Sequence, residues 1–212
     1  MEKKNKKNFL DIFKSSIFAP ISSMDENVCA LKETKSAFIF AGLVSIGIML
    51  ANLIATIFNT VFARKYDFWT QKYKWDISLS NLDGLNYVDL IFKSLLQYAL
   101  MVLCIAGVLY LIVLVLKKET TYVKALGTIS VSIIPNIVLA LVASILGIIW
   151  SPLKVVVLAA AVTYTILILT FALKNLIKEN NIDKLVFYSV IVMAILKLLD
   201  YIIFTSDLFN II

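Results

Sequence analysis

Long apolar runs without a charged residue constrain this chain more than any other feature of its sequence. The first run, SAFIFAGLVSIGIMLANLIATIFNTVFA, fills the interval between Lys35 and Arg64. A helix needs about 20 mostly apolar residues to cross the hydrocarbon core of a bilayer. Hydrophobic residues make up 61% of the chain, more than the roughly 45–50% of soluble domains. The sequence therefore predicts a membrane protein and excludes an ordinary water-soluble domain.

Five runs of this kind predict five membrane-spanning helices. They cover approximately residues 37–63, 94–116, 125–150, 155–173 and 185–204. Only the link SPLK separates the third run from the fourth, so these two helices are expected to form an antiparallel hairpin. The predicted fold class is all-α: a polytopic membrane protein with five transmembrane helices and an N-terminal interfacial amphipathic helix.

The distribution of lysines predicts how the chain is oriented. Seven lysines precede the first run, three lie in the loop after the second run, and three lie in the loop after the fourth. Cytoplasmic loops of membrane proteins carry an excess of lysine and arginine. We therefore expect a multi-pass protein of the cell membrane, with its N-terminus in the cytoplasm and its C-terminus outside. Residues 1–35 form the expected cytoplasmic segment, and residues 36–212 form the expected transmembrane domain.

The cytoplasmic segment combines a lysine cluster with an apolar stripe at helical spacing. The residues of this candidate membrane-surface anchor are Lys3, Lys4, Lys6, Lys7, Phe9, Phe13 and Ile17. A basic amphipathic helix of this kind binds the anionic inner leaflet of a bilayer. The same stripe fits a helix that docks against the protein's own bundle, and both interpretations stay open. Pro20 is expected to end the helix.

Two groups of residues within the spans form a candidate intramembrane polar site. Lys197 and Asp200 lie three residues apart in the fifth span, hence on one helix face, where they fit either an ion relay or a structural pair. Pro135 and Asn136 lie in the middle of the third span, where proline removes a backbone hydrogen bond and is expected to kink or locally open the helix. Such a helix can bind a substrate.

Features of the same spans also support a purely structural interpretation. Ala143 and Gly147 have the spacing that lets two helices approach closely. Asn52, Asn59 and Gln97 are expected to link the first two spans by hydrogen bonds. The aromatic loop between these spans fits an anchor at the membrane interface or a surface that binds an external partner.

The residue content argues against most enzyme chemistry. The chain has no histidine and two cysteines, Cys29 and Cys104, and it contains no Gly-Lys phosphate loop, GxSxG elbow or HExxH pair. We expect no enzyme activity, no catalytic residue, no cofactor, no metal site and no nucleic-acid partner.

The arrangement resembles the Yip family of membrane proteins, which is named for interaction with Ypt/Rab GTPases. The resemblance rests on IFAP before the first span, KKETTYVKALG before the third, and SVSIIP ending at Pro135. It implies a domain of five spans with a cytoplasmic N-terminus. The DLYGP signature of eukaryotic members is absent, so Rab binding is not carried over. The abundance of Ile, Lys and Asn suggests an AT-rich genome and a bacterial member.

Two hypotheses for function follow. In the first, the protein is a scaffold or adaptor that acts through lipid contacts and through a membrane-protein partner or a second copy of itself. In the alternative, it is a permease for a small solute or ion, or a membrane subunit of a transport complex. A cavity that joins Asn136 to Lys197 and Asp200 would favour transport, whereas a dry bundle would favour the scaffold.

Overall fold

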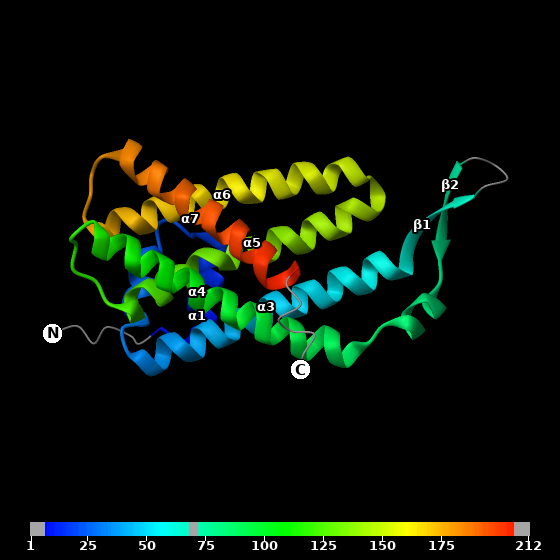
Figure 1. Ribbon diagram of the computed structural model, residues 1–212, viewed down its shortest axis with the longest axis horizontal. Helices are drawn as coiled ribbons and strands as arrows, with labels where there is room; N and C mark the ends of the chain where they lie inside the picture. The colour runs from blue at the N-terminus through cyan, green and yellow to red at the C-terminus, as the bar shows by residue number, and fades with distance from the viewer. Residues whose placement is uncertain (1–6, 68–71, 206–212) are drawn as a thin grey trace.

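Long helices form a bundle with two short helices at one end and a β-hairpin at the other, as the computed structural model shows (Figure 1). The structure describes residues 7–67 and 72–205, without the side chains of 63–67, 72–76, 151, 200 and 203–205. The elements are α1 (Phe9–Phe18), α2 (Met24–Ala30), α3 (Thr34–Val61), β1 (Phe62–Asp67), β2 (Lys72–Ile77), the 3-10 helix η1 (Leu79–Gly84), the π-helix η2 (Asp89–Lys93), α4 (Ser94–Val115), α5 (Tyr122–Ile149), α6 (Ser151–Ile177) and α7 (Ile182–Thr205).

Four of the described helical stretches are long and apolar enough to cross a membrane. They are α3, Asp89–Val115 with α4 as its main part, α5, and the Pro152–Ile177 part of α6. These stretches coincide with the first four predicted spans and confirm a multi-pass helical membrane protein. The fifth predicted span corresponds to α7, which has 24 residues and is not one of the four.

The helix α5 lies at the centre of the bundle. Every residue from Ala125 to Pro135 is buried, and α5 contacts α3, α4, α6 and both short helices. A helix that is apolar on all sides has no face for water and is covered by neighbours. α5 continues as an α-helix through Pro135, so the helix is not interrupted at the point where the sequence suggests a local opening.

The hairpin of β1 and β2 is a difference from the all-α prediction. The two strands pair antiparallel, with Arg64 opposite Trp75 and Tyr66 opposite Tyr73. From the sequence, this segment is expected to be a loop between the first two spans. Two strands without further partners are marginally stable in water, so the hairpin is an addition to the helical bundle and not a second core. Phe68 and Trp69, in the predicted aromatic loop, lie outside the described residues.

The apolar stripe of α1 faces the bundle. Phe9, Phe13 and Ile17 are partly buried against the core, and Ile12 between them is 1% exposed. α1 and α2 both contact α5 and together cover one end of the bundle; we refer to these two helices as the cap. The structure thus has the docked arrangement, the second of the two interpretations of this helix. α1 ends at Phe18, just before Pro20, as predicted.

The lysine cluster in front of α1 is described only in part. Lys3, Lys4 and Lys6 lie outside the described residues. The ammonium group of Lys7 lies 2.8 Å from a carboxylate oxygen of Glu26 in α2. Glu26 is largely exposed and Lys7 is half-buried, so solvent screens the pair and it adds little to stability, but it gives one lysine of the cluster a contact within the cap.

A buried asparagine joins the two helices of the cap. The side chain of Asn27 is 0% exposed. Its Oδ1 accepts hydrogen bonds from Lys7 Nζ at 3.1 Å and from Ser15 Oγ at 3.0 Å. Its Nδ2 donates to Ser16 Oγ and Ser23 Oγ, both at 3.0 Å. An asparagine amide has two donor hydrogens and two acceptor lone pairs, so the hydrogen-bonding capacity of this side chain is fully used inside the protein.

Candidate functional site

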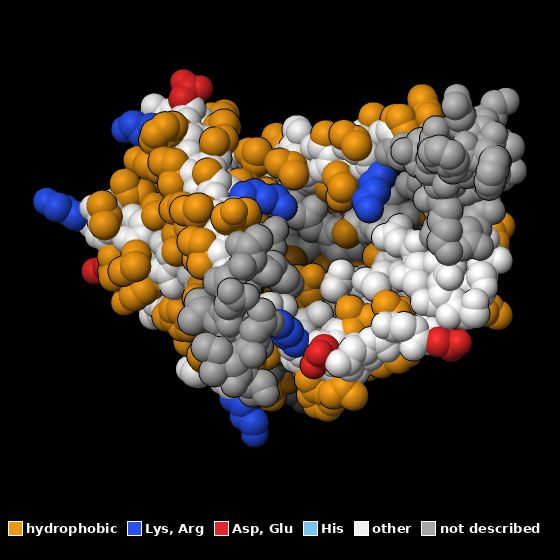
Figure 2. Space-filling model, turned by 45° about the vertical axis from the view of Figure 1, so that its right-hand side comes forward, with side chains coloured by type: hydrophobic (Ala, Val, Ile, Leu, Met, Phe, Trp, Pro, Cys, Tyr) orange, Lys and Arg blue, Asp and Glu red, His pale blue; other side chains and the backbone are white. Residues whose placement is uncertain are grey.

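A cavity of about 450 Å³ lies between α3, α4, α5, α6 and α7, in the half of the bundle away from the cap. We refer to it as the bundle cavity. Figure 2 shows the molecule hollowed on this face, with lysine or arginine side chains at the margin of the hollow among hydrophobic ones. The polar residues that line the bundle cavity are Asn52, Thr56, Asn59, Tyr98, Asn136, Ser144, Lys154 and Lys197. The rest of the lining is apolar, as is typical of sites for small molecules.

Three polar residues reach the bundle cavity from α3. Asn52, Thr56 and Asn59 are four and three residues apart, a spacing that puts them on one face of a helix. From the sequence, Asn52 and Asn59 are expected to form hydrogen bonds with the second span. In the structure both side chains line the cavity, so this helix face offers amides and a hydroxyl to a ligand.

A second polar face comes from α5. Asn136, Ala140 and Ser144 follow one another at intervals of four residues and all line the cavity. The hydroxyl of Ser144 donates its one hydrogen to the carbonyl of Ala140 at 2.9 Å, so it can only accept a hydrogen bond from a ligand. Asn136 is half-buried, and its amide makes no hydrogen bond within the described part of the chain. Its neighbour Pro135 is buried and does not line the cavity.

Two lysines from neighbouring helices face this polar surface. Lys154 lies in the first turn of α6, and Lys197 lies in the second half of α7. A charged side chain at membrane depth is costly unless it meets water, a partner or a ligand. None of the described residues that line the cavity is acidic, so the two lysines give this part of the lining a cationic character.

The position of Lys154 depends on a glycine in α5. A Cβ atom built on Gly147 would lie 3.0 Å from both Cβ and Cδ of Lys154. Real side chains almost never come closer, so the aliphatic part of this lysine occupies the space that a larger residue would need. The small-residue spacing of Ala143 and Gly147 thus has a specific use at Gly147, where it makes room for the stem of a lysine from the next helix.

The geometry suits an acid with an apolar tail. Amides, hydroxyls and ammonium groups bind a carboxylate or phosphate group, and the aliphatic walls suit a hydrocarbon chain. Among the described residues there is no group of three or more side chains able to hold a metal ion.

The structure brings together part of the predicted intramembrane site. Asn136 and Lys197 line the same cavity, although 61 positions separate them in the sequence (197 minus 136). Pro135 does not take part, and the side chain of Asp200 lies outside what the structure describes. Lys154 is missing from the predicted site because in the sequence it belongs to the short link between two spans, and only its proximity to Gly147 reveals its role.

A bundle in which four helices can cross a bilayer makes this chain a multi-pass helical membrane protein. The family model of the Yip1 domain matches residues 15–202. Because this match covers most of the sequence, the chain belongs to the Yip family, as the resemblance in the sequence predicts. The matched region extends from within α1 to within α7 and includes the bundle cavity. No curated protein and no solved structure matches the chain.

Proposed function

We propose that this Yip-family protein binds an anionic amphiphile inside the membrane, with the acidic group in the bundle cavity and the apolar chain against its aliphatic wall. The protein acts without catalysis in this proposal. The observation that carries it is that Lys154 and Lys197 line one cavity together with the amides of Asn52 and Asn136. None of the described residues of that lining is acidic. A cationic cavity in a lipid environment favours a bound anion because desolvated charges attract strongly at low dielectric.

The proposal includes α7 as the fifth span. The hydroxyl of Thr170 in α6 lies 3.0 Å from Ser189 Oγ in α7 and 2.8 Å from Ile166 O in its own helix, so these two acceptors share its one hydrogen. Ser189 is fully buried. Hydrogen bonds between apolar helices stabilise their association in lipid. With α7 in the membrane and the lysine-rich end of the bundle in the cytoplasm, the N-terminus is cytoplasmic and the C-terminus lies outside a bacterial cell membrane.

The test of the cavity is a binding measurement on the full chain in lipid nanodiscs, with a fluorescent fatty acid as the probe. Replacing Lys154 by Gln removes one charge-assisted hydrogen bond, a contribution of about 1.5–3 kcal/mol, and should weaken binding about 10-fold or more. The control is Lys184→Gln, which removes the same charge from an exposed position near the start of α7. Equal affinity of Lys154→Gln and the parent protein would contradict the proposal.

The permease hypothesis requires that the protein also transports the anion that it binds. Flux of an anionic solute into vesicles should then depend on Asn136 and Lys197. Asn136→Ala and Lys197→Ala should abolish this flux while leaving the amount of protein in the membrane unchanged. Binding without flux would limit the role to binding.

The scaffold role is a second candidate, and the outward side of α1 favours it. Leu10 and Phe18 are 64% and 85% exposed, while the opposite side of α1 packs on the core. Exposed apolar side chains beside lysines suit the surface of an anionic leaflet or a membrane-protein partner, including a second copy of this chain. Replacing Leu10 and Phe18 by Ser should release a partner that co-purifies with the parent protein, and Lys14→Ser is the control on the same helix.

A further inference from the structure

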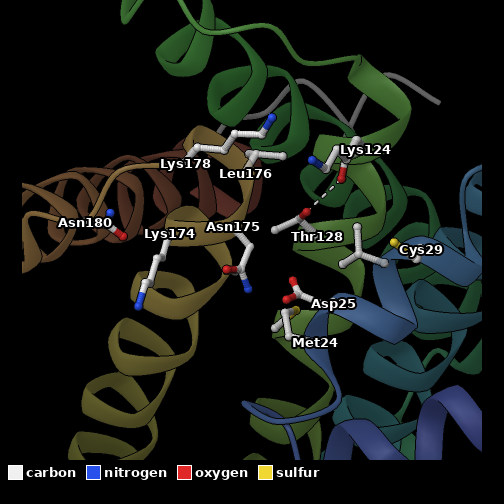
Figure 3. Close-up of a pocket in the computed structure, with 12 residues that line it drawn as sticks. Met24, Asp25, Cys29, Lys124, Thr128, Lys174, Asn175, Leu176, Lys178 and Asn180 are labelled. Carbon is white, nitrogen blue, oxygen red and sulfur yellow. Dashed lines mark hydrogen bonds between the residues drawn. The ribbon is translucent and has the colours of Figure 1, made fainter.

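A second cavity lies at the opposite end of the bundle, beside the cap. It has a volume of about 520 Å³ and lies between α2, the start of α5 and the end of α6 (Figure 3). Three lysines line it, namely Lys124, Lys174 and Lys178. We refer to this cavity as the lysine pocket. It does not share a residue with the bundle cavity, so what it binds is a separate question from the proposed function.

Two of the three lysines extend toward the same space. In Figure 3 the side chains of Lys124 and Lys178 bring their nitrogen atoms to the same side of the pocket, above Thr128, whereas Lys174 points its nitrogen away from them. Lys124 lies in the first turn of α5, and Lys178 directly follows the last residue of α6. Both positions are at helix ends, where the spans α5 and α6 meet the polar headgroups of a bilayer.

The backbone at Lys178 shows that a lysine stands where glycine is the usual residue. Lys178 ends α6 with φ 51° and ψ 41°, in the left-handed region. That conformation is unfavourable for a residue with a side chain relative to glycine, and helices commonly end on glycine there. The local fold would therefore accept glycine, and the lysine contributes its charge to the pocket.

Neutral and acidic groups complete the lining. The amide of Asn175 points into the pocket and faces Asp25 of α2 (Figure 3). Asp25 is the one carboxylate among the described lining residues, so Lys124 and Lys178 leave a positive excess. The neighbouring Glu179 is directed to the chain itself, because its Oε1 accepts from the backbone N–H groups of Asn180 and Asn181 at 3.0 and 3.1 Å.

We propose that the lysine pocket binds a phosphate group, such as that of an anionic phospholipid headgroup, between Lys124 and Lys178. Ammonium groups bind phosphate by charge-assisted hydrogen bonds. Basic pockets between helices at the cytoplasmic side of membrane proteins suit anionic headgroups. The Asn175 amide is a further donor, and Asp25 limits affinity by repelling the phosphate.

A cysteine in the pocket allows a direct test. Cys29 is exposed and lines the lysine pocket, and Cys104, in α4, is the other thiol of the chain. In a Cys104→Ala background, the rate at which N-ethylmaleimide modifies Cys29 reports on occupancy of the pocket. The reagent is neutral and crosses membranes, so orientation affects its access little. Surface charge changes the thiolate fraction of Cys29, so protection is compared between variants in vesicles of the same composition. The full chain is reconstituted in phosphatidylcholine vesicles with and without phosphatidic acid, and mass spectrometry follows the modification.

Phosphatidic acid should slow the modification of Cys29 in the parent background. Lys124→Gln and Lys178→Gly should each weaken this protection about fivefold, as expected for the loss of about 1 kcal/mol per lysine. Asp25→Asn should strengthen it. Lys184→Gln removes a lysine outside the pocket and should leave the protection unchanged. Equal rates of all variants in phosphatidylcholine alone would show that the fold is intact.

The source of the phosphate is resolved by a further arm of the same experiment. Inorganic phosphate added to phosphatidylcholine vesicles should give little protection if the ligand is a lipid headgroup. Protection by inorganic phosphate that depends on Lys124 and Lys178 would identify a soluble phosphate as the ligand. The proposal is overturned if neither phosphate source slows the modification, or if Lys184→Gln reduces protection as much as Lys124→Gln.

Discussion

Asn27 in the cap and Asn136 in the bundle cavity are the same residue type in two different settings. Asn27 is fully buried and makes four hydrogen bonds to Lys7, Ser15, Ser16 and Ser23. Asn136 is half-buried, faces a cavity, and makes no hydrogen bond within the described part of the chain. Polar groups whose bonding capacity is used internally hold the structure together, whereas polar groups directed at a cavity remain available to a ligand.

The same contrast applies to the charges at the two ends of the bundle. Lys7 at the cap pairs with Glu26 at 2.8 Å. Lys154 has no ion pair within the described residues, and its stem lies against Gly147. The cap is therefore expected to respond to mutation mainly through stability, and the bundle cavity mainly through binding.

The largest expected effect on stability is at the centre of the cap. Replacing Asn27 by Ala removes four buried or part-buried hydrogen bonds at once, although each partner keeps one other contact, and should destabilise the protein by about 2–4 kcal/mol. The measurement is unfolding in detergent followed by tryptophan fluorescence. Ser22→Ala, at an exposed position beside the cap, should change stability by about 0.5 kcal/mol or less. A similar loss in both variants would remove the distinction between the two regions.

A methyl group at Gly147 should affect the bundle cavity more than the fold. Gly147→Ala forces the stem of Lys154 to move, which should weaken binding of the fluorescent fatty acid several-fold and destabilise the protein by about 1 kcal/mol. Gly42→Ala is the matched control, because no atom lies within 4 Å of the Cβ position there. It should bind normally and gain about 0.5–1 kcal/mol in stability from better helix propensity. Normal binding by Gly147→Ala would argue against this role of the glycine.

Removing the hydrogen bond between α6 and α7 should have the next smaller effect on stability. Thr170→Val removes a hydroxyl that is shared between Ser189 Oγ in α7 and Ile166 O in its own helix. The loss of the contact with α7 should cost about 0.6 kcal/mol, the average for such bonds in membrane bundles. Thr163→Val is the control on the same helix, because its hydroxyl bonds only to Ala159 O within α6. The stability of the two variants in detergent should differ in this direction; no difference would show that the bond does not hold α7 in the bundle.

Removing an unbonded hydroxyl in α5 should raise the stability of the protein, whereas the preceding substitution lowers it. Ser130 is fully buried, and its Oγ has no hydrogen-bond partner in the described part of the chain. Ser130→Ala should therefore raise thermal stability slightly, by about 1 kcal/mol or less. Ser132→Ala, which removes a hydroxyl bonded to Thr128 O at 2.7 Å, should not. A marked loss in Ser130→Ala would point to a partner for this hydroxyl.

The smallest expected effect is the pH response of the turn between α6 and α7. Backbone hydrogen bonds from Asn181 and Asn180 lower the pKa of Glu179 below its usual 4.5. Stabilisation of the turn is therefore present above pH 4.5 and is lost as the pH falls through the lowered pKa. The amide resonance of Asn181 should titrate with a midpoint below 4.5, and a midpoint above this value would contradict the hydrogen bonds.

The sequence predicts those features of the structure that depend on the residues of a single helix. Uncharged runs locate α3, α4, α5 and α6 because span length is a local property. The apolar stripe of α1 is also a local property. Whether the stripe packs on the membrane or on the protein's own bundle depends on distant residues, so the sequence does not decide between these two surfaces. Asn136 and Lys197 stand out because polar residues in apolar runs are rare and often functional.

The remaining features depend on contacts between distant segments. Nothing around Asn27 in the sequence identifies Lys7 or Ser15 as its partners. Lys154 looks like part of a link, and its role comes from Gly147 in the preceding helix. The pairing of Arg64 with Trp75 depends on the register between β1 and β2, and the sequence of these charged segments does not indicate that register. Each of these features needs the fold before its chemistry can be assigned.

The most direct test of the bundle cavity as a cationic binding site is an experimental structure of the full chain in nanodiscs that contain an anionic lipid. We predict an elongated density in the cavity, with its acidic group about 3 Å from the Nζ atom of Lys154 and close to Lys197. A cavity closed by side chains, with no density beside either lysine, would contradict the central claim.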